Sequence, residues 1–423
     1  MNRWYLRRPV VAWALYDWAN AAFATTVMAG FFPTFFRQYW SVGADVTTTT
    51  FRLGLANGLA GLAVAALAPV LGVLADRGAQ RRQFLLVWTL LGILATAALY
   101  GVGRGQWGLA AGLFLLATMG YSGAMVFYDS LLIQVAAPAE FDRVSAYGYG
   151  LGYLGGGILF AFNVLMTLHP AWFGLESAAA AVRFSFLNVA VWWFMFSLPL
   201  ALGVSESAAG SGEGSAGGTR TGTESTTWRE LYVTLRAATQ QRALWLFLVA
   251  YWLYIDGVNT IVKMAVDYGM ALGLPVSGLL RALLLTQFVA FPAALAFGWI
   301  GTRIGARRAI LIGLMVYLGV TLWATKLNTI GGFYGMAVMV GLVQGGVQSL
   351  SRSLFGQFVP PGKAAEYFGF YNMLGKFAAV LGPVLIGITA AVTGNPRSGI
   401  GSVALLFAAG AFLLWRVEVP KCT

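Results

Sequence analysis

The sequence contains very little of what soluble proteins use to build catalytic and metal sites. Among its 423 residues there is one cysteine, Cys422, and one histidine, His169. A single cysteine excludes an internal disulfide and a cysteine-based metal cluster. The chain also lacks the His-Glu-x-x-His pattern of zinc peptidases and the glycine-rich Walker loop that holds nucleotide phosphates. We therefore expect neither an enzyme nor an ATP-driven pump, and no resident cofactor or metal.

Charged residues are also scarce. Asp, Glu, Lys and Arg make up 10% of the chain, against about 25% in soluble domains, whereas hydrophobic residues make up 59%. Apolar runs of about 20 residues, which is the length that spans a bilayer, recur throughout. These features predict an all-α integral membrane protein. The net charge of +12 is explained by Lys and Arg in short loops beside the apolar runs, so it does not predict binding to nucleic acid.

The apolar runs predict twelve transmembrane helices, with both termini on one side of the membrane. Lys and Arg are more frequent on that side, which is the cytoplasm by the positive-inside rule. A Gly/Ser/Thr-rich stretch predicts a flexible cytoplasmic linker over residues 205–240, between six-helix bundles over 1–204 and 241–423. The expected spans are 11–36, 54–75, 84–103, 108–135, 146–167, 184–203, 243–265, 279–301, 309–325, 332–358, 368–392 and 399–416.

The two predicted bundles repeat each other. Three pairs of similar segments occur in the same order: residues 13–20 with 251–259, 72–82 with 298–308, and 128–138 with 351–361. In the first pair, Asp17 and Asn20 correspond to Asp256 and Asn259, and each Asp lies on the same helical face as its Asn. Internal repeats of this kind are typical of secondary transporters, in which the substrate site lies near the membrane midplane between the repeats.

The segment Gly72-Val-Leu-Ala-Asp76-Arg77-Gly-Ala-Gln-Arg81-Arg82 resembles the signature loop of the major facilitator superfamily, and the six-plus-six layout extends this resemblance over the whole chain. Segments 16–20, 256–259 and 371–379 resemble the branch that includes the fungal autophagy-related vacuolar amino-acid effluxer and its bacterial relatives. The resemblance implies alternating access by two rocking halves, a cavity lined by helices one, four, seven and ten, and amino acids as cargo.

The two loops supply candidate gating residues, which are Asp76, Arg77, Arg81 and Arg303. The second loop departs from the family pattern, because Thr302 stands where the first loop has Asp76. Any charge relay through these loops is therefore expected in the first half only.

Five charged residues lie away from the ends of the predicted spans, namely Asp17, Asp129, Asp256, Arg352 and Lys376. An ionised side chain that faced lipid at the bilayer centre would cost about 2.5–3.5 kcal/mol. We therefore expect most of the five to be paired or to line a hydrated cavity. The candidate substrate and proton pathway consists of Tyr16, Asp17, Asn20, Tyr254, Asp256, Asn259, Gln348, Arg352, Asn372 and Lys376.

Asp129 and Arg352 occupy equivalent positions in the two halves and carry opposite charges. A pseudo-twofold axis along the membrane normal can bring them together as a gate on the cytoplasmic side. Two alternatives stay open: the planar guanidinium of Arg352 suits bidentate binding of a substrate carboxylate, and the two residues can also form a static structural pair.

The roles of two other charged residues are also open. Asp256 lies near the midplane by helical rise and is the candidate for proton coupling, or else it satisfies backbone groups near Gly257 or a neighbouring Tyr or Asn. Lys376 either binds an anionic group or extends its ammonium toward water at the membrane edge.

Together these features predict a monomeric secondary transporter for a small polar or zwitterionic solute. The family resemblance implies that this solute is an amino acid. Transport can also be coupled to protons. Paired opposite charges favour a zwitterion. The alternatives are a drug or sugar exporter of the same superfamily and, less favoured, a channel or lipid scramblase. Compact loops and the lack of a targeting segment favour a bacterial inner membrane with both termini in the cytoplasm.

Overall fold

A computed structural model of the chain describes residues 4–419, apart from 45–47, 50–51, 53–54, 56–57, 60, 64–70, 74, 77–79, 204–239 and 379–380. Nine helical spans in this described part are long and apolar enough to cross a bilayer. The expectation of an all-α membrane protein is thereby confirmed. Most of the predicted second span, 54–75, and nearly all of the predicted linker lie outside the described residues.

The first half begins with a helix that is longer than the predicted span 11–36. It runs from Arg8 to Trp40 through α1 (Arg8–Ala22), η2 (Phe23–Phe31), α2 (Phe32–Phe35) and η3 (Phe36–Trp40). The segments η2 and η3 are π-helical, a wider winding that occurs frequently at functional sites. The later helices are α4 (Arg81–Ala98), α5 (Trp107–Val135), α6 (Phe141–Leu168) and α7 (Ala178–Gly203), with 3₁₀ turns η1 (Trp4–Leu6), η4 (Leu99–Gly101), η5 (Pro138–Glu140) and η6 (Pro170–Phe173).

The second half differs from the expected spans near its C-terminal end. The predicted single span 368–392 corresponds to two helices, α13 (Ala364–Phe377) and α14 (Leu381–Thr393), and the span 399–416 corresponds to α15 (Pro396–Ser402) and α16 (Ala404–Trp415). The preceding helices are α9 (Arg242–Ala271), α10 (Val276–Ile304), α11 (Ala306–Ala324) and α12 (Ile330–Gly356). Gly305, with a φ of +88°, connects α10 to α11 in a single residue, because glycine adopts positive φ without strain.

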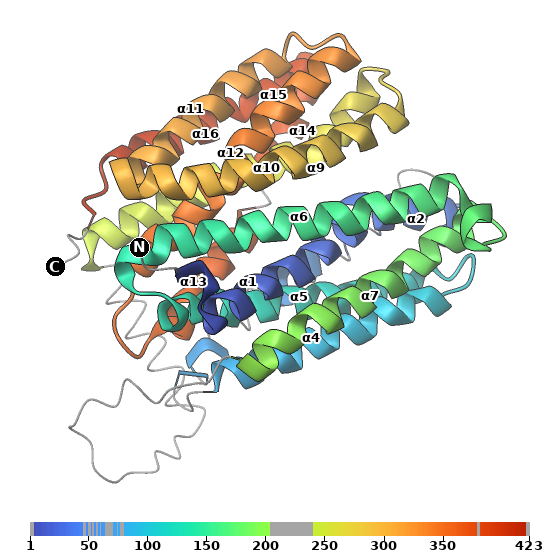
Figure 1. Ribbon diagram of the computed structural model, residues 1–423. Coiled ribbons are helices and arrows are strands. Elements are labelled where there is room, and N and C mark those ends of the chain that lie inside the picture. Colours follow the sequence, from blue (N-terminus) through green and yellow to red (C-terminus); the bar gives the residue numbers. More distant parts are fainter. Residues whose placement is uncertain are drawn as a thin grey trace.

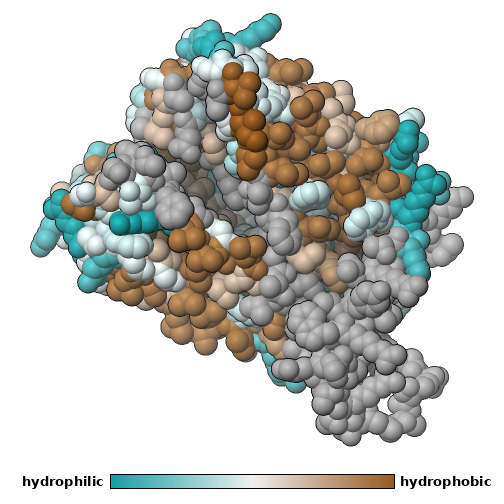
Figure 2. Space-filling view, turned by 180° about the vertical axis from the view of Figure 1, so that it is seen from behind, coloured by the Kyte–Doolittle hydropathy of each residue, from teal (hydrophilic) through white to brown (hydrophobic). Residues whose placement is uncertain are grey.

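The helices of the two halves gather in two lobes, and both termini lie at the same end of the molecule (Figure 1). We call this end the terminal side. Hydrophobic side chains cover the flanks of both lobes, and the surface is hollowed between them (Figure 2). Helix α13 belongs to the second half by sequence but packs against α5 of the first half as well as against α9.

Helix α6 connects the lobes because glycines let helices approach it closely from both sides. Gly148, Gly152 and Gly156 face α1, and a Cβ atom at Gly156 would lie 3.1 Å from the carbonyl oxygen of Ala21. Gly150 faces α10 of the other half, where a Cβ atom would lie 3.2 Å from the side chain of Leu295. Small residues at helix interfaces allow such close packing in membranes. The same helix therefore carries contacts to both lobes.

Candidate functional site

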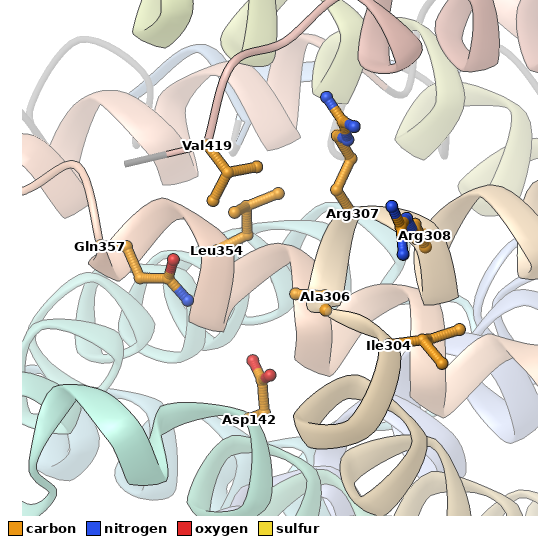
Figure 3. Close-up of a pocket in the computed structure, with 9 residues that line it drawn as sticks. Asp142, Ile304, Ala306, Arg307, Arg308, Leu354, Gln357 and Val419 are labelled. Carbon is orange, nitrogen blue, oxygen red and sulfur yellow. The ribbon is translucent and has the colours of Figure 1, made fainter. Parts of the chain in front are cut away.

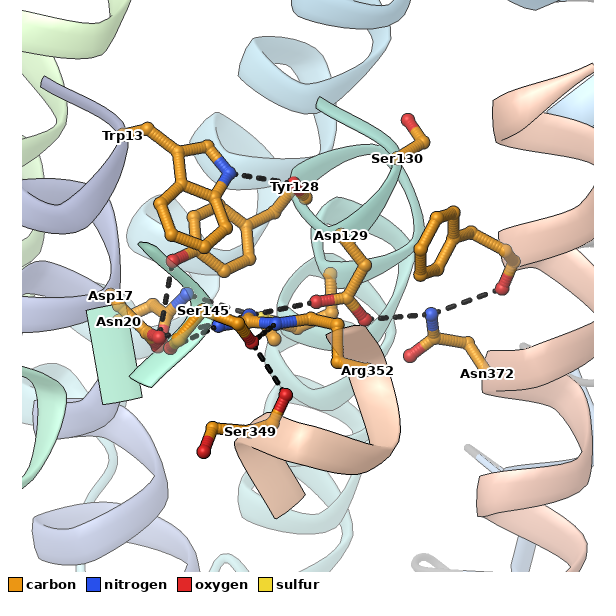
Figure 4. A network of polar contacts seen from close by, with 12 residues as sticks. Trp13, Asp17, Asn20, Tyr128, Asp129, Ser130, Ser145, Ser349, Arg352 and Asn372 are labelled. Carbon is orange, nitrogen blue, oxygen red and sulfur yellow. Dashed lines mark hydrogen bonds and ion pairs between the residues drawn. The ribbon is translucent and has the colours of Figure 1, made fainter. Parts of the chain in front are cut away.

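The guanidinium of Arg352 on α12 is completely buried and lies at the centre of a polar network that joins the two halves (Figure 4). Its Nη1 donates a hydrogen bond to Oδ1 of Asp129 on α5 at 3.0 Å. Its Nε donates to Oγ of Ser145 on α6 at 2.9 Å, and its Nη2 donates to the carbonyl oxygen of Ser145 at 3.0 Å. One cation from the second half is thus held by two helices of the first half.

Aromatic rings enclose the same guanidinium. Its carbon atom lies 4.7 Å from the ring centroid of Trp13, 5.2 Å from that of Tyr128 and 4.3 Å from that of Tyr149. Such cation–π contacts are worth about 2 kcal/mol or more when they are desolvated. Because all three nitrogens of Arg352 already donate hydrogen bonds and the rings cover the group, a solute carboxylate has no access to it in this conformation.

Asp129 is held from both sides. While Oδ1 accepts from Arg352, Oδ2 accepts from Nδ2 of Asn372 on α13 at 2.9 Å. Asn372 also donates to the carbonyl oxygen of Phe368, one turn earlier in its own helix, at 3.0 Å. The structure therefore brings together three of the residues that the sequence selected, from α5, α12 and α13.

Asp17 lies at the edge of this network. Its Oδ2 accepts from the hydroxyl of Tyr128 at 3.1 Å and is 3.9 Å from Nη1 of Arg352. Asn20, one turn further along α1, donates from Nδ2 to the sulfur of Met125 at 3.2 Å. Thioether sulfur is a weak acceptor. Asp17 and Asn20 are both buried, yet both have weaker partners than Asp129 has.

The remaining neutral candidates are distributed around this centre. Tyr16 and Tyr254 are fully buried, and each shares a hydrogen bond with a hydroxyl of its own half: Tyr16 with Thr89 at 2.6 Å, and Tyr254 with Ser351 at 2.7 Å. The structure does not bring these two tyrosines together. Gln348 on α12 accepts from the Tyr153 hydroxyl on α6 at 2.9 Å and so adds a contact between the halves. Asn259 is half-buried on α9.

Asp256 on α9 is fully buried and contacts the beginning of α14. Its Oδ2 accepts from the backbone N–H of Leu381 at 2.9 Å, and its Oδ1 accepts from that of Gly382 at 2.9 Å and from the Thr260 hydroxyl at 3.1 Å. A carboxylate at the first turn of a helix satisfies N–H groups that have no partner within the helix and interacts favourably with the helix dipole. Asp256 therefore satisfies backbone groups, although they belong to α14 and not to the surroundings of Gly257.

A second carboxylate holds the beginning of α13 on the terminal side. Asp76 accepts from the backbone N–H groups of Ala365 at 3.0 Å and Glu366 at 2.8 Å, and from Nε of Arg81 at 2.7 Å. A Cβ atom at Gly72 would lie 2.4 Å from the carbonyl oxygen of Ala365, so only glycine permits this approach. Burial raises the pKa of the Asp76 carboxyl above its usual value, while Arg81 and the two N–H groups oppose that rise.

The second signature-like loop makes a different contact. Arg303 is exposed and stacks 5.0 Å from the ring centroid of Trp299, so the structure does not bring it to the other candidates. A carboxylate is nevertheless present here, because Asp142 at the start of α6 accepts from the Ser353 hydroxyl of α12. The sequence did not single out Asp142. The only hint was that the second loop has Thr302 where the first loop has Asp76, so that a carboxylate at this contact has to come from another segment.

A cavity of about 330 Å³ opens beside this contact on the terminal side, away from the Arg352 network (Figure 3). It is lined by Asp142, Ile304, Gly305, Ala306, Arg307, Arg308, Leu354, Gln357 and Val419. Nη1 of Arg307 is engaged elsewhere, since it donates to the carbonyl oxygen of Val417 at 2.5 Å.

Two candidates from the sequence, Arg77 and the side chain of Lys376, lie outside the described part of the chain.

Comparisons with known proteins agree with this architecture. A family model described as "vacuole effluxer Atg22 like" matches residues 40–141 and 134–423. The chain is 35% identical over 405 residues to YxiO of Bacillus subtilis strain 168, an uncharacterized MFS-type transporter, and this match covers 95% of the chain and 93% of the relative. It is 26% identical over 300 residues to autophagy-related protein 22-1 of Penicillium rubens, covering 66% of the chain and 49% of that relative. The chain thus spans about half the length of the fungal protein.

Solved structures give the same fold. The structure matches the crystal structure of FucP, a major facilitator superfamily transporter, with a TM-score of 0.73 at 12% identity, over 99% of this chain and 100% of FucP. It also matches the human organic anion transporter MFSD10 with a TM-score of 0.69 at 16% identity, over 96% of this chain and 99% of that one. The chain therefore belongs to the vacuole effluxer Atg22-like family and is a multi-pass membrane transporter of the major facilitator superfamily, not an enzyme.

Proposed function

We propose that this transporter carries a small zwitterionic solute, an amino acid, by alternating access, as a monomer in a bacterial inner membrane with both termini in the cytoplasm. The observation that carries the proposal is the buried network in which Arg352 of the second half meets the carboxylates of Asp129 and Asp17 from the first half. A pump for hydrophobic drugs would not need three ionisable side chains at such a place, because each is costly in the membrane interior. The similarity to a Bacillus transporter supports the location.

The contacts between the halves on the terminal side support a gate there. They include Arg352 with Asp129, Ser353 with Asp142, and Asp76 with the first turn of α13. Opening the protein on this side requires the Arg352–Asp129 and Ser353–Asp142 contacts to break, while α13 either leaves the first half or moves with it. In the proposed cycle they hold the terminal side closed until solute has bound from the opposite side.

Proton coupling, if it uses Asp256, would act through α14. A proton on the carboxylate would replace an acceptor with a hydroxyl donor and weaken the hydrogen bonds from Leu381 and Gly382. The beginning of α14 would then be released. This connects the titration of one buried group to the movement of a helix of the second half.

The proposal is tested with purified protein in proteoliposomes. We expect saturable uptake of radiolabelled amino acids and counterflow, in which solute preloaded inside accelerates entry from outside; a channel or scramblase does not show counterflow. Uptake of a sugar or a lipophilic drug without uptake of any amino acid would replace the proposed cargo.

A pair of matched variants connects transport to the network. Arg352→Lys keeps the charge but loses the planar fork that serves Asp129 and Ser145 together. Arg183→Lys is the control, because the Arg183 guanidinium also combines a hydrogen bond to a carbonyl oxygen, that of Tyr100, with a ring contact, but lies at an exposed site in one half. We expect the first variant to lose transport and the second to keep it.

A further inference from the structure

Asp17 has fewer hydrogen-bond donors than the other two aspartates within the spans. Asp129 receives an arginine and an amide, and Asp256 receives two backbone N–H groups and a hydroxyl. Asp17 receives one phenolic hydroxyl on Oδ2, and no described residue donates to its Oδ1. Its side chain is 8% exposed, whereas that of Arg352 is 0% exposed. A buried carboxylate oxygen without a donor is costly in a membrane interior, so Oδ1 of Asp17 is suited to accept from a further donor.

Two hydroxyls on α5 have the same deficit. Thr118 and Ser122 are buried, and neither hydroxyl has a hydrogen-bond partner within the described part of the chain. Three other buried hydroxyls of the first half, those of Thr96, Ser185 and Ser197, donate to the carbonyl oxygen one turn earlier, whereas that of Thr26 has no partner among the described residues either. Since most buried polar groups in proteins are hydrogen-bonded, the two hydroxyls on α5 are suited to a partner that comes from outside the chain.

These groups lie along α1 and α5, and we call this line the seam; Oδ1 of Asp17 is at its edge beside α6, where a Cβ atom at Gly152 would lie 3.3 Å from it. Ser122, Met125 and Asp129 share one face of α5 by helical spacing. The opposite face packs against α4, where a Cβ atom at Gly123 would lie 2.5 Å from the Trp88 ring. Asn20 contacts Met125 and therefore lies beside Ser122. Asp17, Asn20, Ser122 and Thr118 thus follow one another away from the Arg352 network.

The second half presents a matching group. The amide oxygen of Gln344 on α12 is buried and has no hydrogen-bond partner among the described residues. Gln344 precedes Arg352 by eight residues and Ser122 precedes Asp129 by seven, a rise of about 10–12 Å along each helix. Because Arg352 and Asp129 are in contact, Gln344 and Ser122 lie at similar depth on the two sides of the interface.

We propose that the seam of Asp17, Asn20, Ser122 and Thr118 binds the solute, with its ammonium group on Oδ1 of Asp17 and its carboxylate on the donors of Asn20 and Ser122. This inference rests on the proposed function and defines how the solute is oriented. Arg352, whose nitrogens are all engaged, holds the halves together and does not bind the carboxylate. The third hydroxyl, that of Thr118, and the amide of Gln344 then face the solute side chain.

Three series of compounds test the orientation by their effect on the melting temperature of the purified full-length protein, together with competition against amino-acid uptake. They are the common amino acids, the amines that lack the carboxylate, and the acids that lack the ammonium group. We expect amino acids to bind tightest, amines about tenfold more weakly and acids not at all. Hydrogen bonds to charged groups account for a loss of this size.

Variants locate the two ends of the solute. Asp17→Asn is expected to weaken binding of amino acids and amines about 10- to 100-fold, and Asp17→Glu to restore part of it. Ser122→Ala is expected to weaken amino acids but not amines. Ser185→Ala is the matched control, because it removes a buried helical hydroxyl that bonds within its own helix. Melting temperature without ligand separates a loss of binding from a loss of folding.

Each pattern of results decides between the two proposals. Amino-acid binding that Asp17→Asn leaves unchanged, or acids that bind as well as amino acids, would reject the seam but leave the proposed function intact. Amines that bind through Asp17 while amino acids do not would reject the proposed cargo and retain the ammonium site. Binding by none of the three series would reject both.

Discussion

Replacing Asp129 by asparagine should open the terminal side. The substitution removes the negative charge beside the buried guanidinium of Arg352, and it leaves one acceptor oxygen where the carboxylate has two, one for Arg352 and one for Asn372. Removing one partner of a buried ion pair costs about 3–5 kcal/mol. The cost here should be smaller, about 2–3 kcal/mol, because the bonds to Ser145 persist and the Asp17 carboxylate is only 3.9 Å from Nη1. Since the pair forms only when the halves meet, this energy shifts the conformational equilibrium by roughly 30- to 160-fold.

Spin labels on two exposed residues of the terminal side, one in each half, measure that shift. The single cysteine is first removed by Cys422→Ser, and cysteines are then introduced by Gln83→Cys and Glu418→Cys. We expect the Asp129→Asn protein to show a longer and broader distance distribution than the parent. The control is Glu140→Gln, which removes a carboxylate from the Arg7 ion pair within the first half. Superimposable distributions for Asp129→Asn and its parent would show that the pair does not hold the gate.

Further substitutions probe the other contacts. The charge-swapped Asp129→Arg, Arg352→Asp protein should recover transport only in part in the uptake assay, since an arginine at 129 lacks the Ser145 bonds and the aromatic enclosure; full recovery would mean that charge alone matters. Gly382→Ala should lower the melting temperature, because its Cβ atom would lie 1.9 Å from the Thr260 hydroxyl; adding Thr260→Ala should restore it only in part, because Oδ1 of Asp256 and Cβ of residue 260 would each still lie 2.8 Å away. Asp76→Asn should increase hydrogen exchange at the start of α13, because an amide has one acceptor oxygen where the carboxylate has two; unchanged exchange would contradict the contact. Asp256→Asn should reduce transport and its dependence on a proton gradient, and uptake that keeps that dependence would remove Asp256 from any coupling path.

The fold, and the contact between Asp129 and Arg352, could be predicted from the sequence because the chain is duplicated. Asp129 and Arg352 stand at equivalent positions of the repeat, so pseudo-symmetry alone suggested that they meet. The aromatic enclosure of Arg352 was not predictable in the same way. Aromatic residues make up 14% of the chain, and nothing distinguishes Trp13 or Tyr149 from those that only pack.

The hydrogen bonds of Asp256 could not be predicted from the sequence for a different reason. Its partners are two N–H groups that exist as donors only because a helix begins at Leu381. The apolar run around that residue predicted one continuous span, and hydrophobicity does not report where a run is divided into two helices. The pair Gly382-Pro383 was the available signal, since both residues disfavour a helix interior.

The division between α13 and α14 constrains how the halves can move. Helix α13 is bound to the first half at two points, through Asp76 at its first turn and through Asn372 on Asp129. Helix α14 is bound within its own half, to Asp256 of α9. If the halves rock apart on the terminal side, either α13 leaves the first half or α13 moves relative to α14. Hydrogen exchange distinguishes the two: in Asp129→Asn, faster exchange confined to the Asp76-bound turn of α13 indicates release, whereas faster exchange that begins at Leu381 indicates movement between the two helices.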